Sequence, residues 1–445
     1  VIYVTGPEDI GWAIDARTGR QIWRYRRDVM QGIVACCGRV NRGFAVLGDR
    51  LFKTTLDAHV VALNIKTGAV IWDATLEDYK KAYSSSAAPL VVKDKIVVGM
   101  MGGEYGVRGF IDAYDTQTGK RAWRFYTTAG PEDPGHNTWQ GPDPKAWEHG
   151  GGTTWKTGAY DPDLNLVFWG TGNAGPDWNG TQREGDNLYT ASIVALDGDT
   201  GKLKWHYQFT PHDVWDYDAT QQPVLAELPI NGQQRKVVLF ANRNGFFYVL
   251  DRATGKMLNA KPYATTTWAE EIGSDGRPVQ LTGQIPNEEG VRVCPDPLGS
   301  TNFMAPSYDP VRRLFFVTSR ESCGTFFAWT QEYTPGESYL GGGFLRTGER
   351  PYSALRAIDP VTMEKKWEFK YANQSWAGVL STASGVVFAG SSGNFTAFDA
   401  MTGKDLWKYQ MGAPLYNGAV TYMLDGKQYV LVAAGTNIVS FALSQ

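Results

Sequence analysis

One short phrase, small-x-Asp-x-x-Thr-Gly-x-x-x-Trp, occurs in seven near-copies along this chain. Each copy predicts a strand that ends in a small residue and Asp, a tight turn with Gly at positive φ, and a second strand that delivers a Trp. A period of about 40 to 50 residues with these features is typical of stacked propeller blades, with one indole wedged between neighbouring sheets. The copies occupy residues 13–23, 62–72, 113–123, 195–205, 249–259, 357–367 and 397–407.

The repeat predicts one all-β domain over residues 1–445, although this length would ordinarily suggest two or three domains. We expect an eight-bladed β-propeller, because residues 437–445 match the strand that should precede an eighth phrase. The chain begins inside a strand, one strand short of its first phrase, which indicates a processed or truncated start. Pairing of the N- and C-terminal segments in the last blade would hide both sheet edges.

Composition excludes several classes of protein. The 51 Gly and 22 Pro residues suit many turns better than many helices. Residues 77–83 predict at most one or two helical turns. The net charge of −3, with no basic run, argues against a nucleic-acid partner. Without a stretch of 18 or more apolar residues, no membrane span is expected.

The four cysteines are Cys36, Cys37, Cys294 and Cys323, and none lies in a Cys-x-x-Cys motif. Two disulfides in an oxidising compartment would account for all four. Buried free thiols are the alternative. No Cys-x-x-Cys-His haem signature occurs.

Two intervals between phrases are too long for one blade, from 113 to 195 and from 249 to 357. They leave room for long loops at 131–152, 261–299 and 333–350, and sites are commonly built on such loops. The segment 170–175, GTGNAG, formally matches a dinucleotide fingerprint. No helix is expected after it and its surroundings predict strands, so nicotinamide binding is rejected.

Four residues with oxygen ligands fall where strands are expected to end: Glu104, Asn173, Asp216 and Asp218. Carboxylate and amide oxygens form a set suited to a hard cation. Zinc would favour His or Cys, and the five histidines are not spaced as ligands. Taken singly, each residue is better explained as a turn residue or a solvated charge, and spacing alone does not join them.

Several segments resemble the quinoprotein alcohol dehydrogenases, the pyrroloquinoline-quinone family that includes methanol dehydrogenase. The most specific are ACCGRVNRG, GGEYGVRG, GGGTTWKTGAYDP, WGTGNAGPDWN, PHDVWDYD, NRNGFFYVLDRATG and SWAGVLSTASGVVFAG, and the resemblance runs essentially end to end. It implies eight four-stranded blades with tryptophan-docking repeats and a quinone lying over a metal on the ring axis.

The resemblance also implies the cofactor contacts. Cys36–Cys37 resembles a vicinal disulfide that stacks on one face of the quinone, and Trp155 resembles the indole on the other. Arg42 matches an arginine that pairs with a cofactor carboxylate. Ser86 stands where the family usually has Thr, and Gly103 stands where Ala is common. The remaining implied contacts are Gly102, Thr153, Arg243, Asn302 and Trp376.

Glu104, Asn173 and Asp216 match the family's metal ligands, and Asp216 also matches its base. Asp216 would accept the alcohol proton while hydride passes to the quinone, and Arg243 would stabilise charge on the quinone oxygens. Asp218 departs from calcium-dependent methanol dehydrogenases, which have a small residue here, and resembles lanthanide-dependent members. The segment DYDATQQPVL, which contains Asp218, also resembles membrane glucose-dehydrogenase relatives, and in those relatives Asp at this position does not indicate a lanthanide. The metal is therefore Ca²⁺ or a trivalent lanthanide. One expected acidic residue near the cofactor would lie before Val1.

The sequence thus predicts a periplasmic dehydrogenase that oxidises an alcohol to an aldehyde or ketone and passes electrons to an external carrier such as cytochrome c. A sugar or polyol dehydrogenase on the same site is one alternative. A non-catalytic propeller scaffold for outer-membrane assembly is another, which explains the repeats but not the site residues. The oligomeric state stays open, with a homodimer as one option. Trp139, Trp147, Tyr339 and Phe344 in the long loops suggest a roomy apolar substrate pocket.

Overall fold

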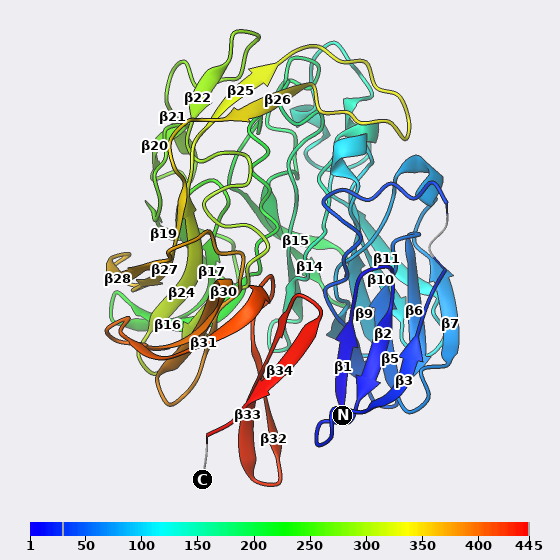
Figure 1. Cartoon of the computed structure of the whole chain (residues 1–445). Helices are drawn as coiled ribbons and strands as arrows, with labels where there is room; N and C mark the ends of the chain where they lie inside the picture. Colours follow the sequence, from blue (N-terminus) through cyan, green and yellow to red (C-terminus); the bar gives the residue numbers. More distant parts are fainter. Residues whose placement is uncertain (29–30, 444–445) are drawn as a thin grey trace. The chain divides into compact units, whose positions relative to one another are not determined.

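The computed structural model describes residues 1–28 and 31–443. They divide into two compact units. The first comprises residues 1–220, 285–290 and 326–343, and the second comprises 221–284, 291–325 and 344 to the end. Both are built mainly from antiparallel sheets, and in most of these sheets the strands follow one another along the chain (Figure 1).

The first unit contains one three-stranded and three four-stranded sheets. The three-stranded sheet comprises β1 (Ile2–Thr5), β2 (Gly11–Ile14) and β3 (Gln21–Tyr25). The four-stranded sheets comprise β4 (Ala45–Leu47), β5 (Arg50–Thr54), β6 (His59–Asn64) and β7 (Val70–Thr75); β8 (Leu90–Val92), β9 (Lys95–Gly99), β10 (Phe110–Asp115) and β11 (Arg121–Tyr126); and β12 (Ala159–Asp161), β13 (Leu166–Gly170), β14 (Ser192–Asp197) and β15 (Leu203–Gln208).

The second unit contains two four-stranded sheets, β16 (Val224–Ile230), β17 (Gln233–Ala241), β18 (Phe246–Asp251) and β19 (Met257–Pro262), and β23 (Ser307–Asp309), β24 (Leu314–Glu321), β27 (Tyr352–Ile358) and β28 (Lys365–Lys370). Smaller sheets comprise β20 (Ala269–Ile272) and β21 (Pro278–Gln280); β29 (Leu380–Ser381), β30 (Val386–Asp399) and β31 (Asp405–Pro414); and β32 (Val420–Leu424), β33 (Lys427–Ala434) and β34 (Asn437–Phe441). The remaining strands are β22 (Val291–Val293), β25 (Gly324–Ala328) and β26 (Gly342–Arg346).

Every copy of the repeated phrase forms the predicted hairpin. The small residue pairs across the strands with the last residue of its phrase, as Ala62 does with Trp72, and the register shifts directly after that pair. A small side chain is required there because it faces an indole. The Asp at the turn caps it, as Asp15 Oδ1 accepts the N–H groups of Arg17 and Thr18. In the sixth copy Met363 replaces Gly and still adopts a φ of +62°.

The expected docking of tryptophans between neighbouring sheets is confirmed within each unit. Trp72 Nε1 donates to Thr116 O at 3.1 Å, and its ring lies over Gly119 in the turn of the next phrase. A Cβ at Gly119 would lie 2.7 Å from two ring atoms, so this turn has no room for a side chain. The same bond joins Trp23 to Ile65 O, Trp123 to Gly198 O and Trp367 to Ala400 O.

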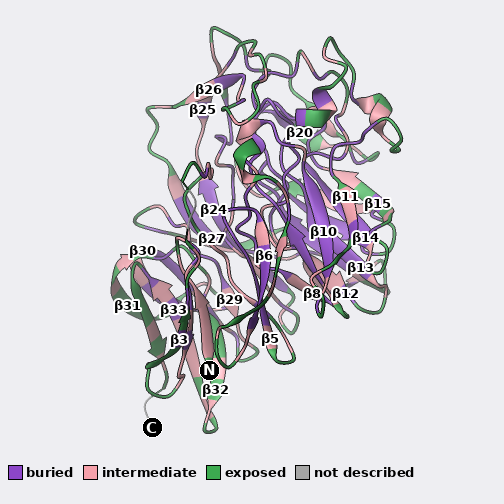
Figure 2. Cartoon of the chain, turned by 90° about the vertical axis from the view of Figure 1, so that its right-hand side faces the viewer, coloured by how far each residue is buried: buried purple, intermediate pink, exposed green. Residues whose placement is uncertain are grey.

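The all-β prediction is confirmed for the described residues. Their helical elements are four short 3₁₀ helices: η1 (Tyr79–Lys81), η2 (Gly103–Tyr105), η3 (His136–Thr138) and η4 (Ala146–His149). Burial concentrates in middle strands such as β10 and β14, which pack between neighbouring sheets (Figure 2). In the part of the chain that is described, no helix has both the length and the apolarity to cross a membrane.

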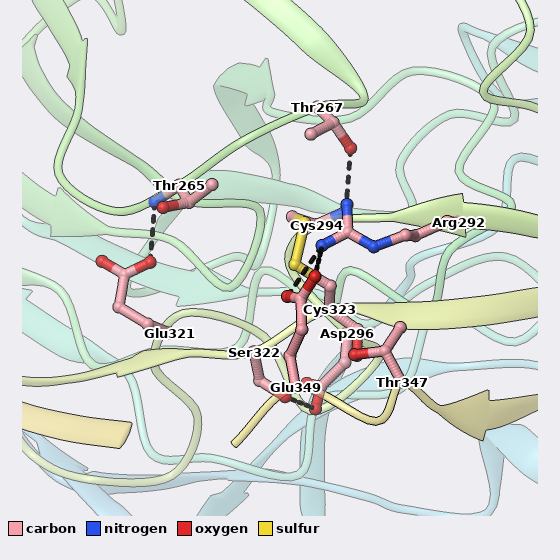
Figure 3. The surroundings of a disulfide bond; sticks show 10 residues. All are labelled: Thr265, Thr267, Arg292, Cys294, Asp296, Glu321, Ser322, Cys323, Thr347 and Glu349. Carbon is pink, nitrogen blue, oxygen red and sulfur yellow. Dashed lines mark hydrogen bonds and ion pairs between the residues drawn. A yellow bond between two sulfur atoms is a disulfide. The ribbon is translucent and has the colours of Figure 1, made fainter. Parts of the chain in front are cut away.

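All four cysteines form disulfides, Cys36–Cys37 and Cys294–Cys323, so the prediction of two disulfides is confirmed and the free-thiol alternative is wrong. Figure 3 shows the second bond, which ties the segment after β22 to the segment after β24. Cys294 N donates to Thr267 Oγ1 at 2.8 Å, which adds a third segment of the second unit.

Candidate metal and cofactor site

A buried turn of the first unit carries Asp216 and Asp218. The carboxylate of Asp213 accepts the backbone N–H groups of Trp215 at 3.2 Å and of Tyr217 at 2.7 Å. These bonds brace the backbone on both sides of Asp216, which has a φ of +58° and is partly buried. Burial raises the pKa of Asp213 to about 7, although the two backbone hydrogen bonds oppose this shift. Asp213 was missed in the sequence, where it is one more Asp of PHDVWDYD.

Asp218 is hydrogen-bonded to two of the other predicted residues. Its Oδ1 accepts the backbone N–H of Asn173, and its Oδ2 accepts Trp155 Nε1, both at 2.9 Å. Gly172 makes this contact possible, because a Cβ there would lie 2.6 Å from Asp218 Oδ1 and 2.9 Å from Thr153 Oγ1. Thr153 O in turn accepts Gly172 N at 2.6 Å. Residues from two neighbouring repeats therefore meet around one buried carboxylate.

Asn173 contacts a further carboxylate, that of Asp177, which is not among the residues predicted for the site. Its Nδ2 donates to Asp177 Oδ1 at 2.9 Å and to Ala174 O at 3.2 Å. Asp177 is only 3% exposed. Burial raises its pKa well above the usual range, and the carboxylates of Glu104 and Asp218 raise it further. The feature of the sequence that could have indicated Asp177 is its charge, which stands between Pro176 and Trp178.

Glu104 lies in η2 and close to the vicinal disulfide. One of its carboxylate oxygens and the sulfurs of Cys36 and Cys37 all lie within 4.8 Å of one another. Disulfide sulfurs are not thiolates and do not make this a zinc-type site. A Cβ added at Gly103 would lie 3.3 Å from Thr153 Oγ1. The absence of a side chain at Gly103 therefore allows η2 to lie close to Thr153. Gly102, directly before η2, has a φ of +123°.

A cationic part of the candidate site is built by Arg42 together with Ser86 and Trp155. The Arg42 guanidinium lies 4.9 Å from the Trp155 ring centroid and donates to Ser86 Oγ. Burial lowers the pKa of Arg42 to about 10, so the group still carries its charge at neutral pH. Among the described residues no carboxylate forms an ion pair with it. A cation in this position fits an anionic ligand.

The other predicted cofactor contacts belong to the second unit. Arg243 Nη1 donates to Pro297 O at 3.1 Å, and Asn302 Nδ2 donates to Leu298 O at 3.0 Å. Trp376 stacks on Phe303, with ring centroids 5.7 Å apart. The second unit thus gathers all three around the loop at residues 296–303.

Two of the aromatic residues expected to line a pocket are buried and hydrogen-bonded. Trp139 is buried and its Nε1 donates to Leu188 O at 2.6 Å. Tyr339 is 2% exposed, and its OH donates to Gln182 Oε1 at 3.1 Å. An open cavity of about 680 Å³ lies instead beside Trp178, and its lining includes Glu184 and Trp329.

The fold and the site together define an all-β protein with tryptophan-docking repeats, a cluster of carboxylate and amide side chains around Asp218, and a glutamate beside a vicinal disulfide. Residues 1–280 and 346–430 match the family described as "PQQ: Glucose/ethanol/alcohol dehydrogenase, beta-propeller domain". The chain belongs to this family of quinoprotein dehydrogenases, as the sequence resemblance predicted.

Individual relatives agree with this assignment. The chain is 42% identical to quinohemoprotein alcohol dehydrogenase ADH IIB of Pseudomonas putida, over 95% of the chain and 64% of that relative. It is 39% identical to quinoprotein alcohol dehydrogenase PedH of Pseudomonas putida, over 98% of the chain and 77% of PedH. A solved structure of a europium-containing methanol dehydrogenase has a TM-score of 0.91 at 36% identity, over 97% of this chain and 80% of that one. The chain therefore spans less than two thirds of ADH IIB.

Proposed function

We propose that this chain is the catalytic part of a quinoprotein dehydrogenase that oxidises an alcohol to an aldehyde or ketone. The observation that carries the proposal is the pair of hydrogen bonds from Trp155 Nε1 and Asn173 N to Asp218. They bring a stacking indole next to two oxygen ligands. A scaffold protein needs the docking repeats but has no use for this cluster.

The donor set fits pyrroloquinoline quinone, an anionic and flat cofactor. Cys36–Cys37 and Trp155 would contact its faces, and Arg42, Ser86 and Thr153 would hold its polar groups. Gly102 and Gly103 would leave room beside the cofactor. Arg243, Asn302 and Trp376 of the second unit stay predicted cofactor contacts. When bound, the quinone supplies a two-electron acceptor for hydride from the alcohol carbon.

Glu104, Asn173, Asp216 and Asp218 fit a hard cation, because every donor is an oxygen. Asp216 would take the hydroxyl proton of the alcohol on a carboxylate oxygen, and Asp213 would keep that carboxylate in place through its backbone bonds. Arg243 would stabilise negative charge that develops during the reaction. Asp218 adds a negative charge that favours a trivalent lanthanide over Ca²⁺.

We further infer that the sheets are blades of a single eight-bladed ring over residues 1–445, closed by the N- and C-terminal segments. The seven phrase copies and the docking of Trp23, Trp72, Trp123 and Trp367, each on the phrase that follows it, support this ring. The two disulfides favour the periplasm. The electron acceptor in this proposal is an external carrier such as cytochrome c. A homodimer is one option for the oligomeric state. A sugar or polyol is the alternative class of substrate.

The test is reconstitution of the metal-free chain with pyrroloquinoline quinone and either Ca²⁺ or La³⁺, followed by dye reduction with alcohols, sugars and polyols. We expect quinone uptake with at least one metal, turnover of an alcohol, and loss of turnover without loss of quinone uptake in Asp216→Asn. Absence of both uptake and turnover with either metal would overturn the proposal. Turnover confined to sugars would favour the alternative substrate.

A further inference from the structure

Asp177 is the buried carboxylate for which the proposed chemistry has no role. It contacts the first unit's candidate ligand Asn173 directly, through the 2.9 Å bond from Asn173 Nδ2 to Asp177 Oδ1. A second bond from Nδ2, to Ala174 O, uses the other hydrogen of the amide. The side-chain nitrogen of Asn173 thus has two acceptors, Asp177 Oδ1 and Ala174 O.

This arrangement decides which atom of Asn173 is presented to a cation. A side-chain amide has two N–H hydrogens on its nitrogen and a carbonyl oxygen on the other side. With the nitrogen held by Asp177 and Ala174, the oxygen Oδ1 is the atom that remains for a metal ion. A flipped amide would present N–H groups to the cation and would place Oδ1 against the Asp177 carboxylate.

The surroundings of Asp177 support a role near a cation. No ion pair joins Asp177 to a described residue. The neighbouring Arg183 donates instead to Asn187 Oδ1, Pro176 O and Asp213 O. A buried carboxylate without an ion-pair partner is unfavourable unless positive charge comes close. The nearby carboxylates of Glu104 and Asp218 are candidates for ligating that charge.

We propose that Asp177 is a positioning residue of the metal site, which holds the Asn173 amide so that its Oδ1 faces the ion. This inference rests on the proposed function, since it requires that Asn173 binds a metal. Partners of metal ligands commonly change metal affinity by about 10- to 100-fold when they are removed. We expect a loss in this range from Asp177→Ala.

The experiment titrates the metal-free full chain, without quinone, with Tb³⁺ and with Ca²⁺. Terbium luminescence sensitised by tryptophan reports binding, because Trp155 contacts the candidate ligand Asp218. The variants are Asp177→Ala, Asn173→Ala and their combination. Asp177→Asn should lose less affinity than Asp177→Ala, because its amide oxygen can still accept from Asn173. Glu227→Gln, which removes an exposed charge from β16 in the second unit, should bind as the parent does.

A role through Asn173 requires that the double variant binds Tb³⁺ no more weakly than Asn173→Ala alone. Additive losses would overturn the proposal, and so would parent-like binding by Asp177→Ala. The melting temperature of the metal-free protein should be little changed in Asp177→Asn, so that a folding defect is separable from a binding defect. If the parent binds neither Tb³⁺ nor Ca²⁺ although the quinone-loaded chain oxidises an alcohol, the positioning proposal fails and the proposed function stands.

Discussion

Trp155 donates its indole N–H to Asp218 Oδ2 at 2.9 Å. The candidate stacking residue is therefore hydrogen-bonded directly to the carboxylate that is expected to favour a lanthanide. The other oxygen of Asp218 is used by Asn173 N. Asp218 therefore contributes both charge and hydrogen bonds, and a substitution there changes more than the charge of the site.

Replacing Asp218 with Asn tests the charge. Asn has one acceptor oxygen, so one of the two donors loses its partner, while the negative charge is removed. We expect La³⁺-supported dye reduction to fall by about 10-fold or more, with a smaller fall for Ca²⁺. Glu227→Gln is the charge-matched control and should leave both rates unchanged. Equal responses of the parent and Asp218→Asn to La³⁺ would argue against a lanthanide.

Replacing Asp213 with Ala tests the brace around Asp216. The buried N–H groups of Trp215 and Tyr217 lose their acceptor, and each unsatisfied group costs about 1–3 kcal/mol. We expect a lower free energy of unfolding in urea and a kcat reduced more than KM, because the base is misplaced. Asp213→Asn keeps an acceptor and should lie between Ala and the parent. An unchanged kcat in the Ala variant would contradict the positioning role.

Replacing Gly119 with Ala tests the docking contact. The substitution forces Ala into a φ of +69° and places its Cβ against the Trp72 ring. We expect a loss of about 2–4 kcal/mol in the free energy of unfolding, measured with urea. Gly48→Ala is the matched control, with a φ of +59° and open space at the Cβ, and should lose only about 1–2 kcal/mol. Equal losses would mean that docking tolerates a methyl group.

His149 gives a pH-dependent prediction. Its ring stacks on Tyr333, with centroids 4.2 Å apart, and meets the edge of Tyr339. Burial lowers the pKa of His149 below its ordinary value of about 6.5, although Asp143 opposes the shift. The folded state thus favours neutral His149, and the stability from this group is complete above pH 6.5 and is lost as the pH falls below it.

Amide hydrogen exchange checks this prediction. After correction for intrinsic rates, residues 333–341 should exchange faster at about pH 5 than at about pH 7.5, because a charged imidazole packs poorly between the two tyrosines. His149→Phe should remove the difference, whereas His136→Gln should keep it. A difference of the same size in His149→Phe would assign the effect to another group.

The amino-acid sequence by itself determined the hairpins, because each depends on neighbours within one short phrase. The small residue, the Asp and the Gly of the turn can all be read in order, and the Trp is explained by the need to cover the next turn. Even Met363, which departs from the phrase, keeps the left-handed turn that its copy predicts. The docking partners of Trp23, Trp72, Trp123 and Trp367 were predictable because each lies in the following copy.

Only the tertiary structure decided the surroundings of the site. Nothing in the spacing joins Trp155, Asn173 and Asp218, because they meet only when loops from neighbouring sheets approach over Gly172. Asp213 and Asp177 looked like ordinary acidic residues, yet one braces the backbone around Asp216 and the other holds the Asn173 amide. Hydrogen bonds and burial act between atoms close in space, and a linear pattern predicts them only where the partners are also close in sequence.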